Sequence, residues 1–484
     1  MARPIAAQQR LDESRRKPMP EPESSQAGGK RALIAGAGIA GLSLAADVET
    51  LGDTVVGFLD DVQTGPQIVG RLADVAAACA RESVDVVYFA IPSATGDVLR
   101  RFVSQTPRNR VELAIVPRTY RVVSRERVSV EDLTDIDVLD MVGRAPVKHD
   151  MLDAREAIAG KRVMVTGAAG SIGSRLATQL HMLDPELVIC VDRSESGMFH
   201  LGQSLIDIPN YRLEIGDVQS EERIAQLIGL YRPEILFHVA AYKHVPLMQH
   251  NTVEAFNNNV WGTLNMLRQA ADFGVERVVY VSTDKAVNPT NIMGATKRIG
   301  ELLLRDLAEP GSRTRFSAVR FGNVLESEGS VMQTFRQQLL HGKNLTVTDR
   351  EVTRYFMTID EASQLVIQTA SRGSQGNLFV LDMGDPIRIY DLAKGLIAAV
   401  NPRLAIDVIG LRPGEKMYEE LSYETSVVDT TTHPKIFIVT EQDKQSHGET
   451  LAWVESLLTR TRNYSISDDE LKTEMRRFGF DEIQ

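Results

Sequence analysis

Cysteine is scarce in this 484-residue sequence, which contains only Cys79 and Cys190. The two are far apart and neither has a partner at a spacing typical of metal ligands, so the sequence predicts no metal site and favours a reducing compartment. No apolar run reaches the roughly 18 residues that a membrane-spanning helix needs. The amino terminus also lacks the apolar core of a signal peptide. These absences favour a cytoplasmic protein.

Positive charge is also limited. The 54 lysines and arginines stand against 65 aspartates and glutamates, which gives a formal net charge of −11. A nucleic-acid partner requires a basic surface, so this balance argues against one. The remaining composition, 43% apolar and 25% charged, is that of an ordinary globular protein. A chain of this length is expected to form two or three domains.

The order of apolar and polar segments divides the chain. Residues 1–29 are polar and rich in Pro, Glu and Ser, which predicts a disordered arm or linker. Apolar strands then alternate with helices over 30–145, and the pattern restarts over 161–484 after a linker at 146–160. This alternation predicts an α/β fold with two tandem Rossmann-like, doubly wound parallel sheets. We expect residues after about 385 to form a smaller α/β substrate-binding part that closes over the second unit.

The first unit contains a glycine turn, "GAGIAG", with Gly36, Gly38 and Gly41 between a strand and a helix. Asp60 ends the next strand, at about the distance of an acid that binds ribose hydroxyls. The pattern indicates either a second nucleotide pocket or a tight turn retained for packing in a unit that binds nothing tightly. The residues alone leave both open.

The second unit contains a wider turn, "TGAAGSIGS", in the G-x-x-G-x-x-G spacing typical of short-chain dehydrogenases. Its glycines let the backbone approach a pyrophosphate at a helix N-terminus. Asp192 ends the next strand and favours NAD over NADP, although Arg193 beside it favours a 2′-phosphate. Asp217 is placed to bind the adenine edge. The predicted NAD site comprises Gly167, Gly170, Ser171, Ile172, Gly173, Asp192, Arg193, Asp217, Val218, Ala240, Ala241 and Lys297.

A candidate active site lies in "VSTDKAVNPTNIMGATKR". Thr283, Asp284 and Lys285 follow the apolar strand "RVVYV" and therefore emerge at the carboxyl end of a parallel strand, where α/β folds place their chemistry. A solvated ion pair at a turn is the alternative, but Lys297 and the glycine turn favour an active site. Lys297 occupies the lysine of a Tyr-x-x-x-Lys frame. The tyrosine position holds Met293, whose thioether cannot exchange a proton.

Several long strings carry a family resemblance. With "TGAAGSIGS", "AAYKHVPLM", "STDKAVNPTNIMGATKR", "RFGNVL", "TRYFMT" and "LRPGEKMYEE", the region from about 161 to 425 resembles the large UDP-N-acetylglucosamine 4,6-dehydratases of bacterial polysaccharide and protein-glycan pathways. The first unit resembles that family's extra Rossmann-like domain through "GAGIAG", "VGFLDD" and "GRAPV". A methionine commonly replaces the tyrosine in this branch, so the resemblance implies that Met293 is compatible with activity.

The resemblance implies NAD-dependent 4,6-dehydration of a UDP-linked N-acetylhexosamine. A hydride leaves carbon 4 of the sugar and returns to carbon 6. Lys285 would remove the carbon-5 proton, which requires a lowered pKa, and Asp284 would protonate the departing carbon-6 hydroxyl. Thr283 would hydrogen-bond the carbon-4 oxygen, and Lys297 would hold the nicotinamide ribose. The acceptor of the carbon-4 hydroxyl proton stays open, with water as one candidate.

The same resemblance implies the substrate contacts. Lys243 and His244 would line the sugar or nicotinamide pocket, although His244 also fits a merely packed histidine. Arginine forks suit a pyrophosphate because they bind its oxygens bidentately. The substrate site implied for the diphosphate and nucleoside comprises Asn323, Arg354, Arg412 and Glu415.

Three residues depart from the family pattern. Glu326 and Glu328 replace small or basic residues after "FGNVL", and such carboxylates are unfavourable near an anionic substrate unless they point outward. Gln249 stands where a glutamate is expected. These departures leave the exact sugar nucleotide open. The family's long members also carry transmembrane helices before the first unit, and this sequence shows none, so it is either a soluble relative or the soluble part of an inner-membrane-anchored enzyme. The family further suggests at least a dimer through helices of the second unit.

Two other functions are compatible with the residues. A 4-epimerase, or a dehydratase that inverts carbon 5, would use the same cofactor. The Asp284–Lys285 pair argues against a simple epimerase, which needs no acid at carbon 6. A nucleotide-sensing scaffold with weak catalysis is the alternative from another class.

Overall fold

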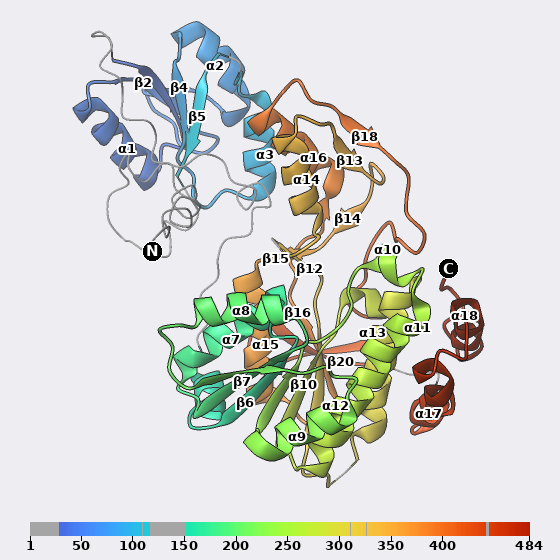
Figure 1. Ribbon diagram of the computed structural model, residues 1–484. Helices are drawn as coiled ribbons and strands as arrows, with labels where there is room; N and C mark the ends of the chain where they lie inside the picture. Colours follow the sequence, from blue (N-terminus) through green and yellow to red (C-terminus); the bar gives the residue numbers. More distant parts are fainter. Residues whose placement is uncertain (1–28, 109, 117–150, 310, 326, 442–444) are drawn as a thin grey trace, which may run out of the picture. The chain divides into compact units, whose positions relative to one another are not determined.

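The computed structural model describes residues 29–108, 110–116, 151–309, 311–325, 327–441 and 445–484. The predicted arm up to residue 28, the string "GRAPV" and Glu326 lie outside these ranges. By its internal contacts the described chain forms two compact units, one with residues 29–91 and 106–116 and one with 92–105 and 151–484 (Figure 1). Each unit is described by itself.

The first unit is built on a five-stranded parallel sheet in the order β3-β2-β1-β4-β5. The central strand β1 is an apolar run, and its residues from Ala32 to Ala35 are fully buried. This order and burial confirm a doubly wound Rossmann-like sheet. Its elements are β1 (Arg31–Ala35), α1 (Ile39–Thr50), β2 (Thr54–Leu59), β3 (Ile68–Gly70), η2 (Leu72–Asp74), α2 (Val75–Glu82), β4 (Val86–Phe89) and β5 (Glu112–Ile115). Helix α3 (Gly96–Gln105) is grouped with the second unit.

The second unit is built on a nine-stranded sheet in the order β19-β20-β16-β11-β10-β9-β6-β7-β8. The strands from β16 to β8 are parallel, and β20 and β19 are antiparallel additions at one edge. The strands are β6 (Arg162–Thr166), β7 (Leu187–Asp192), β8 (Tyr211–Ile215), β9 (Ile235–His238), β10 (Arg277–Val281), β11 (Arg315–Arg320), β16 (Asn377–Leu381), β19 (Val427–Thr430) and β20 (Ile436–Thr440).

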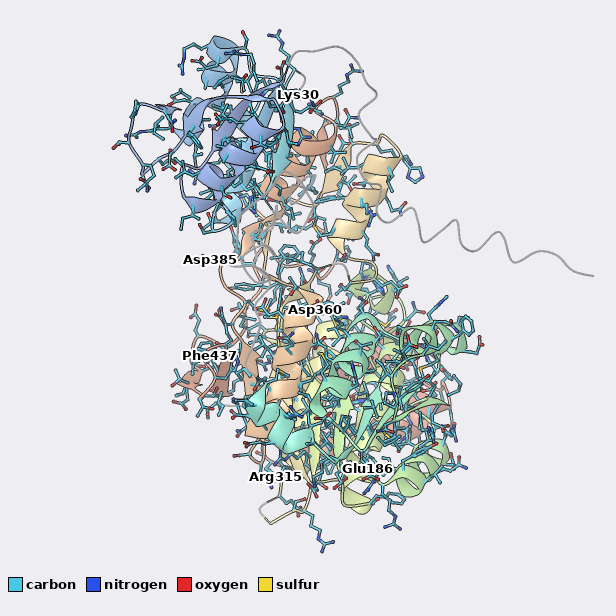
Figure 2. All side chains as sticks on the ribbon, turned by 90° about the vertical axis from the view of Figure 1, so that its left-hand side faces the viewer. Lys30, Glu186, Arg315, Asp360, Asp385 and Phe437 are labelled. Carbon is cyan, nitrogen blue, oxygen red and sulfur yellow. The ribbon has the colours of Figure 1, made fainter. Side chains whose placement is uncertain are left out.

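Helices cover both faces of this sheet, and side chains fill the space between them (Figure 2). Along β6, Met164 belongs to the core on one face, while Val163 and Val165 belong to the core on the other. The helices of this unit are α6 (Leu152–Ile158), α7 (Ser171–Leu180), η4 (His181–Leu183), α8 (Glu195–Ser204), α9 (Glu221–Tyr231), α10 (Val245–Met248), α11 (Thr252–Phe256), the π-helix η5 (Asn257–Trp261), α12 (Gly262–Asp272), η6 (Asp284–Ala286), α13 (Ile292–Leu307), α14 (Val331–Leu340), α15 (Ile359–Arg372), α16 (Ile389–Val400), α17 (Glu449–Arg462) and α18 (Asp468–Arg477). Of these, α14 and α16 pack on each other and on β13 instead of on the main sheet.

The chain after about residue 385, which was expected to form a smaller α/β part, divides between short strand pairs and the main sheet. Strands β19 and β20 extend the main sheet, and α17 and α18 pack against α13 and α11. Within this packing, the Trp453 ring stacks on Phe478 with 4.1 Å between centroids. In the described part of this unit, three short pairs lie apart from the main sheet: β12 (Asn323–Val324) with β15 (Phe356–Met357), β13 (Leu345–Val347) with β18 (Ile406–Val408), and β14 (Thr353–Arg354) with β17 (Ile387–Arg388).

Helix α6 falls in the stretch 146–160 that was expected to be a linker. Its Ala154 and Ile158 are fully buried in the core of the second unit. The described part of that stretch is therefore a packed helix.

The direction of the parallel strands determines where polar side chains gather. Figure 2 shows Glu186 and Arg315, which lie at the amino ends of two strands, at the same lower edge of the second unit. The carboxyl ends therefore meet at the opposite edge. That edge receives the glycine turn after β6 and the "STDK" turn after β10.

Candidate active site

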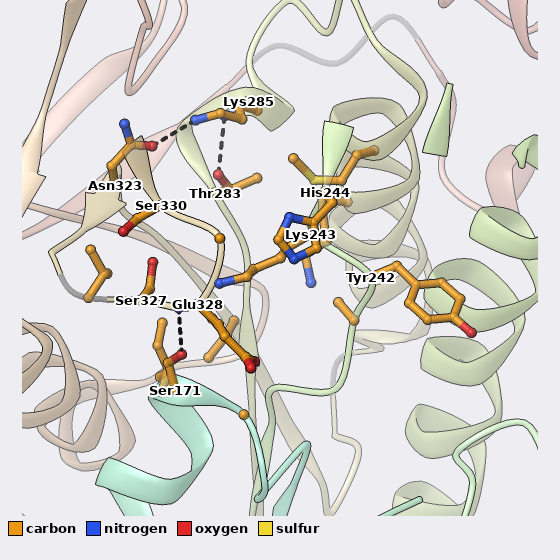
Figure 3. Close-up of a pocket in the computed structure, with 18 of the residues that line it drawn as sticks. Ser171, Tyr242, Lys243, His244, Thr283, Lys285, Asn323, Ser327, Glu328 and Ser330 are labelled. Atoms are coloured by element: carbon orange, nitrogen blue, oxygen red, sulfur yellow. Dashed lines mark hydrogen bonds between the residues drawn. The ribbon is translucent and has the colours of Figure 1, made fainter. Parts of the chain in front are cut away.

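A cavity of about 640 Å³ opens at the carboxyl ends of the parallel strands. Most of the site residues predicted in the second unit line it together (Figure 3). They are Gly167, Gly170, Ser171, Ile172, Gly173, Asp192, Arg193, Asp217, Val218, Ala240, Ala241, Lys243, His244, Thr283, Lys285, Met293, Lys297, Asn323, Arg354, Arg412 and Glu415. Asp284 is fully buried beneath the lining.

The glycine turn has the geometry of a dinucleotide cradle. Gly167 has a φ of +69°, and a Cβ there would lie 2.6 Å from the backbone nitrogen of Ala240. A Cβ on Gly173 would lie 2.0 Å from the Gly167 carbonyl oxygen, so only glycine lets α7 approach the strand. Gly170 is the N-cap of α7 and faces open space apart from one 3.3 Å contact. The residues therefore fit a pyrophosphate held at the N-terminus of α7.

Two carboxylates lie at the ends of the neighbouring strands. Asp192 accepts hydrogen bonds from the backbone nitrogens of Ala169 at 3.0 Å and Ser194 at 2.8 Å, which fixes the acid beside the turn. Arg193 is paired with Asp217 at 3.5 Å and donates to the Tyr242 hydroxyl. The arginine that weakened the inference of NAD is thus engaged by protein groups on the cavity wall.

The "STDK" turn holds a compact acid–base group. Asp284 Oδ1 accepts hydrogen bonds from Thr283 Oγ1 at 2.8 Å and from Lys285 Nζ at 3.0 Å. Lys285 Nζ also donates to Asn323 Oδ1 at 3.1 Å (Figure 3). Asp284 Oδ2 is buried and has no hydrogen-bond partner among the described residues. The hydroxyl, acid and amine thus share one carboxylate oxygen.

The charge state of Lys285 differs from the expectation. Burial opposes its charge, but the carboxylates of Asp284 and Glu419 outweigh burial and the nearby Arg354, so the pKa of Lys285 is raised. The base role requires a lowered pKa, whereas here the pKa is raised most by Asp284 and further by Glu419. Glu419 Oε1 lies 3.6 Å from Lys285 Nζ. Sequence reasoning missed this residue, since 134 positions separate it from Lys285 in the chain and nothing in "YEE" distinguishes it.

Lys297 lies in a drier environment. Its ammonium stands over the Tyr280 ring, 4.0 Å from the centroid, and only 5% of the residue is exposed. Burial lowers the pKa of Lys297 to about 7, although Glu301 opposes the shift. Burial and Lys297 together lower the pKa of His238, under the same ring, to about 3. Lys297 can therefore exchange a proton near neutral pH, which Met293 on the same helix cannot.

A buried ion network fixes the catalytic turn to α13. Glu301, one turn after Lys297, accepts hydrogen bonds from Ser282 at 2.6 Å and from Arg320 at 2.7 and 2.6 Å. Arg298 pairs with Glu301 and Glu441, each at 2.8 Å. Strand β10, helix α13 and strand β11 are thus held in one register beneath the cavity.

A second feature missed from sequence is the π-helix η5, a form that often marks functional sites. Asn259, in η5, accepts from the Tyr242 backbone nitrogen at 2.7 Å and donates to the Tyr242 carbonyl and to Thr296 Oγ1, each at 3.0 Å. It therefore holds the turn that carries Lys243 against α13. The run of three asparagines was visible, but no pattern in it indicated the wider helical turn.

The predicted substrate arginines differ in their availability. Arg354 is 7% exposed, and its Nη atoms donate to the carbonyls of Thr353, Lys416 and Met417 and to Glu415. To bind a phosphate it would have to release these partners, so here it clamps the 415–417 segment. Arg412 is exposed on the cavity wall. It is the better placed of the two for an anionic ligand.

Glu328 does not point outward. It lines the cavity, and its backbone nitrogen donates to Ser171 Oγ at 3.2 Å, at the start of α7 (Figure 3). Burial lowers the pKa of Lys243 and of His244, and Glu328 opposes both shifts. This exposed residue therefore has both solvent and basic neighbours beside it.

Gln249 lies outside the cavity lining. Its Oε1 accepts from the Ile292 backbone nitrogen at 2.7 Å, and its Nε2 donates to the main-chain oxygen of Gln484 at 2.7 Å. A glutamate could not make the second bond unless protonated. The two hydrogen bonds give this position a packing role at the start of α13.

The first unit repeats the turn geometry. Gly36 has a φ of +106°, and a Cβ on Gly41 would lie 1.8 Å from the Gly36 carbonyl oxygen. Asp60 accepts from the backbone of Ala37 at 2.7 Å, as Asp192 does from Ala169. Partial burial favours the neutral acid, but hydrogen bonds from three backbone amides lower the pKa of Asp60. A Cβ on Gly38, the N-cap of α1, would meet no described atom within 4 Å.

The doubly wound sheet, the G-x-x-G-x-x-G turn and Lys297 beside the "STDK" turn define an extended short-chain dehydrogenase/reductase domain. Residues 163–441, more than half of the chain, match the family model described as "Polysaccharide biosynthesis protein". The chain belongs to this family.

Relatives agree with this assignment. The capsular polysaccharide biosynthesis protein CapD of Staphylococcus aureus is 40% identical over 77% of this chain and 63% of its own, so this chain spans less than two thirds of that relative. A UDP-N-acetylglucosamine 4,6-dehydratase (inverting) of Campylobacter jejuni is 32% identical over 54% of this chain and 76% of its own. The X-ray structure of Pen from Bacillus thuringiensis has 32% identity and a TM-score of 0.56, covering 62% of this chain and 98% of that one.

No helix in the described ranges is both long and apolar enough to cross a bilayer.

Proposed function

We propose that the second unit is an NAD-dependent 4,6-dehydratase acting on a UDP-linked N-acetylhexosamine, with UDP-N-acetylglucosamine as the first substrate to test. The observation that carries this proposal is the Asp284–Lys285 pair, 3.0 Å apart, beside a cavity that also contains the glycine turn and Lys297. The name of the Campylobacter relative supports the substrate class. That of CapD supports a place in polysaccharide synthesis.

The proposed cofactor and its binding residues fit the cavity. NAD would be held by the Gly167 turn, with Asp192 at its ribose and Lys297 at the nicotinamide ribose. When bound, NAD supplies a hydride acceptor for carbon 4 and a hydride donor for carbon 6. The chain's own residues then have to transfer protons at carbons 4, 5 and 6.

The first proton leaves the carbon-4 hydroxyl. Thr283 Oγ1 donates to Asp284 Oδ1 at 2.8 Å, so Thr283 can take the substrate proton while passing its own proton to Asp284. This transfer leaves Asp284 as a neutral acid in a fully buried position. Thr283 and Asp284 together would thus take the proton-accepting role of the tyrosine whose position Met293 occupies.

The remaining proton transfers take place at carbons 5 and 6. Neutral Lys285 takes the carbon-5 proton while Asp284 gives its proton to the carbon-6 hydroxyl, which leaves as water. Lys285 then returns its proton to carbon 5. Both residues end as they began, and the carbon-4 hydroxyl proton has left in the water. Because the pKa of Lys285 is raised, this lysine has to lose a proton before turnover, so the rate should rise with pH.

Product analysis tests the proposal. The protein is incubated with NAD and UDP-N-acetylglucosamine, and the nucleotide sugar is examined by mass spectrometry. Loss of one water supports the dehydratase, an isomer of unchanged mass indicates the epimerase, and unchanged substrate indicates a sensing scaffold. Lys285→Ala should abolish the product, whereas Lys343→Ala, at an exposed position, should not.

For the first unit we propose a second nucleotide ligand at Gly36, Gly38, Gly41 and Asp60. The repeated turn geometry supports it. Calorimetric titration of nucleotides into Gly38→Val and unchanged protein tests it. A binding stoichiometry that is equal in the two proteins would remove the proposal.

A further inference from the structure

We propose that Glu419 is a positioning residue whose buried carboxylate stabilises the ammonium form of Lys285, and thereby sets both the pH at which Lys285 becomes a base and the rate at which it takes the carbon-5 proton. The second half of this inference rests on the proposed function. The first half concerns only the pairing of two side chains.

The geometry singles out Glu419. Its side chain is 4% exposed, and Oε1 lies 3.6 Å from Lys285 Nζ and 3.8 Å from Arg354 Nε. Its Oε2 is buried with no hydrogen-bond partner in the described part of the chain. A carboxylate so poorly satisfied by hydrogen bonds depends on nearby positive charge. Lys285 and Arg354 supply that charge.

The neighbours of Lys285 come from four segments. Asp284 contacts Nζ from the same turn, Glu419 from the segment after Gly414 and the uncharged Asn323 from β12. Arg354, on β14, pairs with Glu419 and acts on Lys285 through its charge. Tyr355 also faces Asp284. Two carboxylates thus oppose one arginine, and the raised pKa of Lys285 agrees with this balance.

The pairing has a chemical consequence. When Lys285 takes the carbon-5 proton, the C–H bonding pair stays on carbon, an N–H bond forms and positive charge develops on Nζ. During the same step Asp284 gives up its proton and becomes an anion. Glu419 stands beside the developing ammonium throughout, and fixed charges of this kind stabilise a transition state without reorganising. The same charge also holds a proton on the resting lysine, so activity requires a higher pH.

The pH dependence of kcat tests this role. In Glu419→Gln the acidic limb should move to lower pH by about one unit or more, because one opposite charge is lost. The plateau at high pH should fall about 10-fold or more. Glu420→Gln is the matched control, because Glu420 is 39% exposed and pairs instead with Lys416 at 3.2 Å. An unmoved limb in Glu419→Gln, with only a lower kcat, would overturn the inference.

A second readout is independent of turnover. The Lys285 side chain is 18% exposed on the cavity wall, so brief treatment with acetic anhydride, followed by peptide mass spectrometry, reports its neutral fraction at each pH. Half-modification should occur at lower pH in Glu419→Gln than in the unchanged protein or in Glu420→Gln. Equal values in all three would overturn the pairing. If the unchanged protein forms no product but this shift appears, the proposed function fails and the pairing stands.

The conservative variant covers the case in which Glu419→Gln does not fold. Glu419→Asp keeps the charge and withdraws it by one methylene, so its limb and its half-modification pH should lie between those of the unchanged protein and the glutamine variant. If the glutamine variant does not fold, the acidic limb and the half-modification pH of Glu419→Asp should still lie at lower pH than those of the unchanged protein. Values equal to the unchanged protein would contradict the role of distance in the pairing.

Discussion

Lys297→Met should stabilise the folded protein in a pH-dependent manner. The pKa of Lys297 falls from 10.5 to about 7 because the ammonium is buried over Tyr280. At about 1.4 kcal/mol for each pKa unit, keeping this charge in the folded state costs about 5 kcal/mol when the lysine is fully protonated. Methionine has a similar length and carries no charge, so it removes that cost and loses the contact of the cation with the ring.

The sign follows from proton binding. The unfolded lysine holds its proton up to about pH 10.5, whereas the folded one loses it from about pH 7. Between these values the unfolded state binds more protons, so the stability of the unchanged protein rises with pH. The advantage of Lys297→Met should therefore be largest at about pH 6 and about 2–3 kcal/mol smaller at about pH 9.

Urea unfolding of both proteins across this range measures the difference. His238, Lys297's titratable neighbour under the ring, has a pKa of about 3 and Glu301 one of about 2, so neither should titrate in this window. Lys343→Met, at an exposed position, should show a difference that does not vary with pH. A constant difference for Lys297→Met as well would refute the reasoning, because it would mean that the buried lysine keeps its charge throughout.

Further predictions address the turn and its supports. Met293→Tyr should keep measurable turnover, whereas the turnover of Lys285→Ala should fall about 10²- to 10⁴-fold. Near-normal turnover in Lys285→Ala would exclude Lys285 as the base. Gln249→Glu should lose about 1–3 kcal/mol of unfolding free energy, since its donor to Gln484 disappears; an unchanged denaturant midpoint would contradict this. Gly294→Ala should lose about 1–3 kcal/mol of unfolding free energy and most activity, since a Cβ would lie 2.1 Å from the Lys285 carbonyl oxygen. An unchanged unfolding curve by circular dichroism together with an unchanged kcat would contradict this. Substrate deuterated at carbon 4 should give a product with that deuterium in its new methyl group. In heavy water, carbon 5 should gain deuterium and keep its configuration. Loss of the carbon-4 label, or inversion at carbon 5, seen by NMR, would reject the mechanism.

The local parts of the site could be predicted from the sequence. The Gly167 turn, Asp192 and the "STDK" turn each depend on a strand followed by a short segment, so a few neighbouring residues determine them. The parallel sheets follow from repeated apolar runs for the same reason. The order of these segments predicted that they would meet at one edge, and they line one cavity.

The parts that failed depend on distant segments. Glu419 lies 134 positions from Lys285 in the chain, so its share in the raised pKa of Lys285 has no local pattern behind it, whereas the larger share comes from the adjacent Asp284. The hydrogen-bond partners of Arg354 in residues 415–417 were likewise not predicted, because they lie far from "TRYFMT" in the chain. The antiparallel strands β19 and β20 also lacked a signal, because nothing in their sequences specifies the edge they join.

The packing of α17 and α18 has a consequence for where this enzyme family's fold ends. The family match stops at residue 441, before either helix. Yet Val454 and Leu457 are buried in the main core, and Asn257 donates to the Thr461 carbonyl at 3.0 Å. A protein shortened to end at residue 441 would therefore expose apolar side chains along α11 and α13. The end of the family match and the end of the packed core therefore do not coincide in this chain.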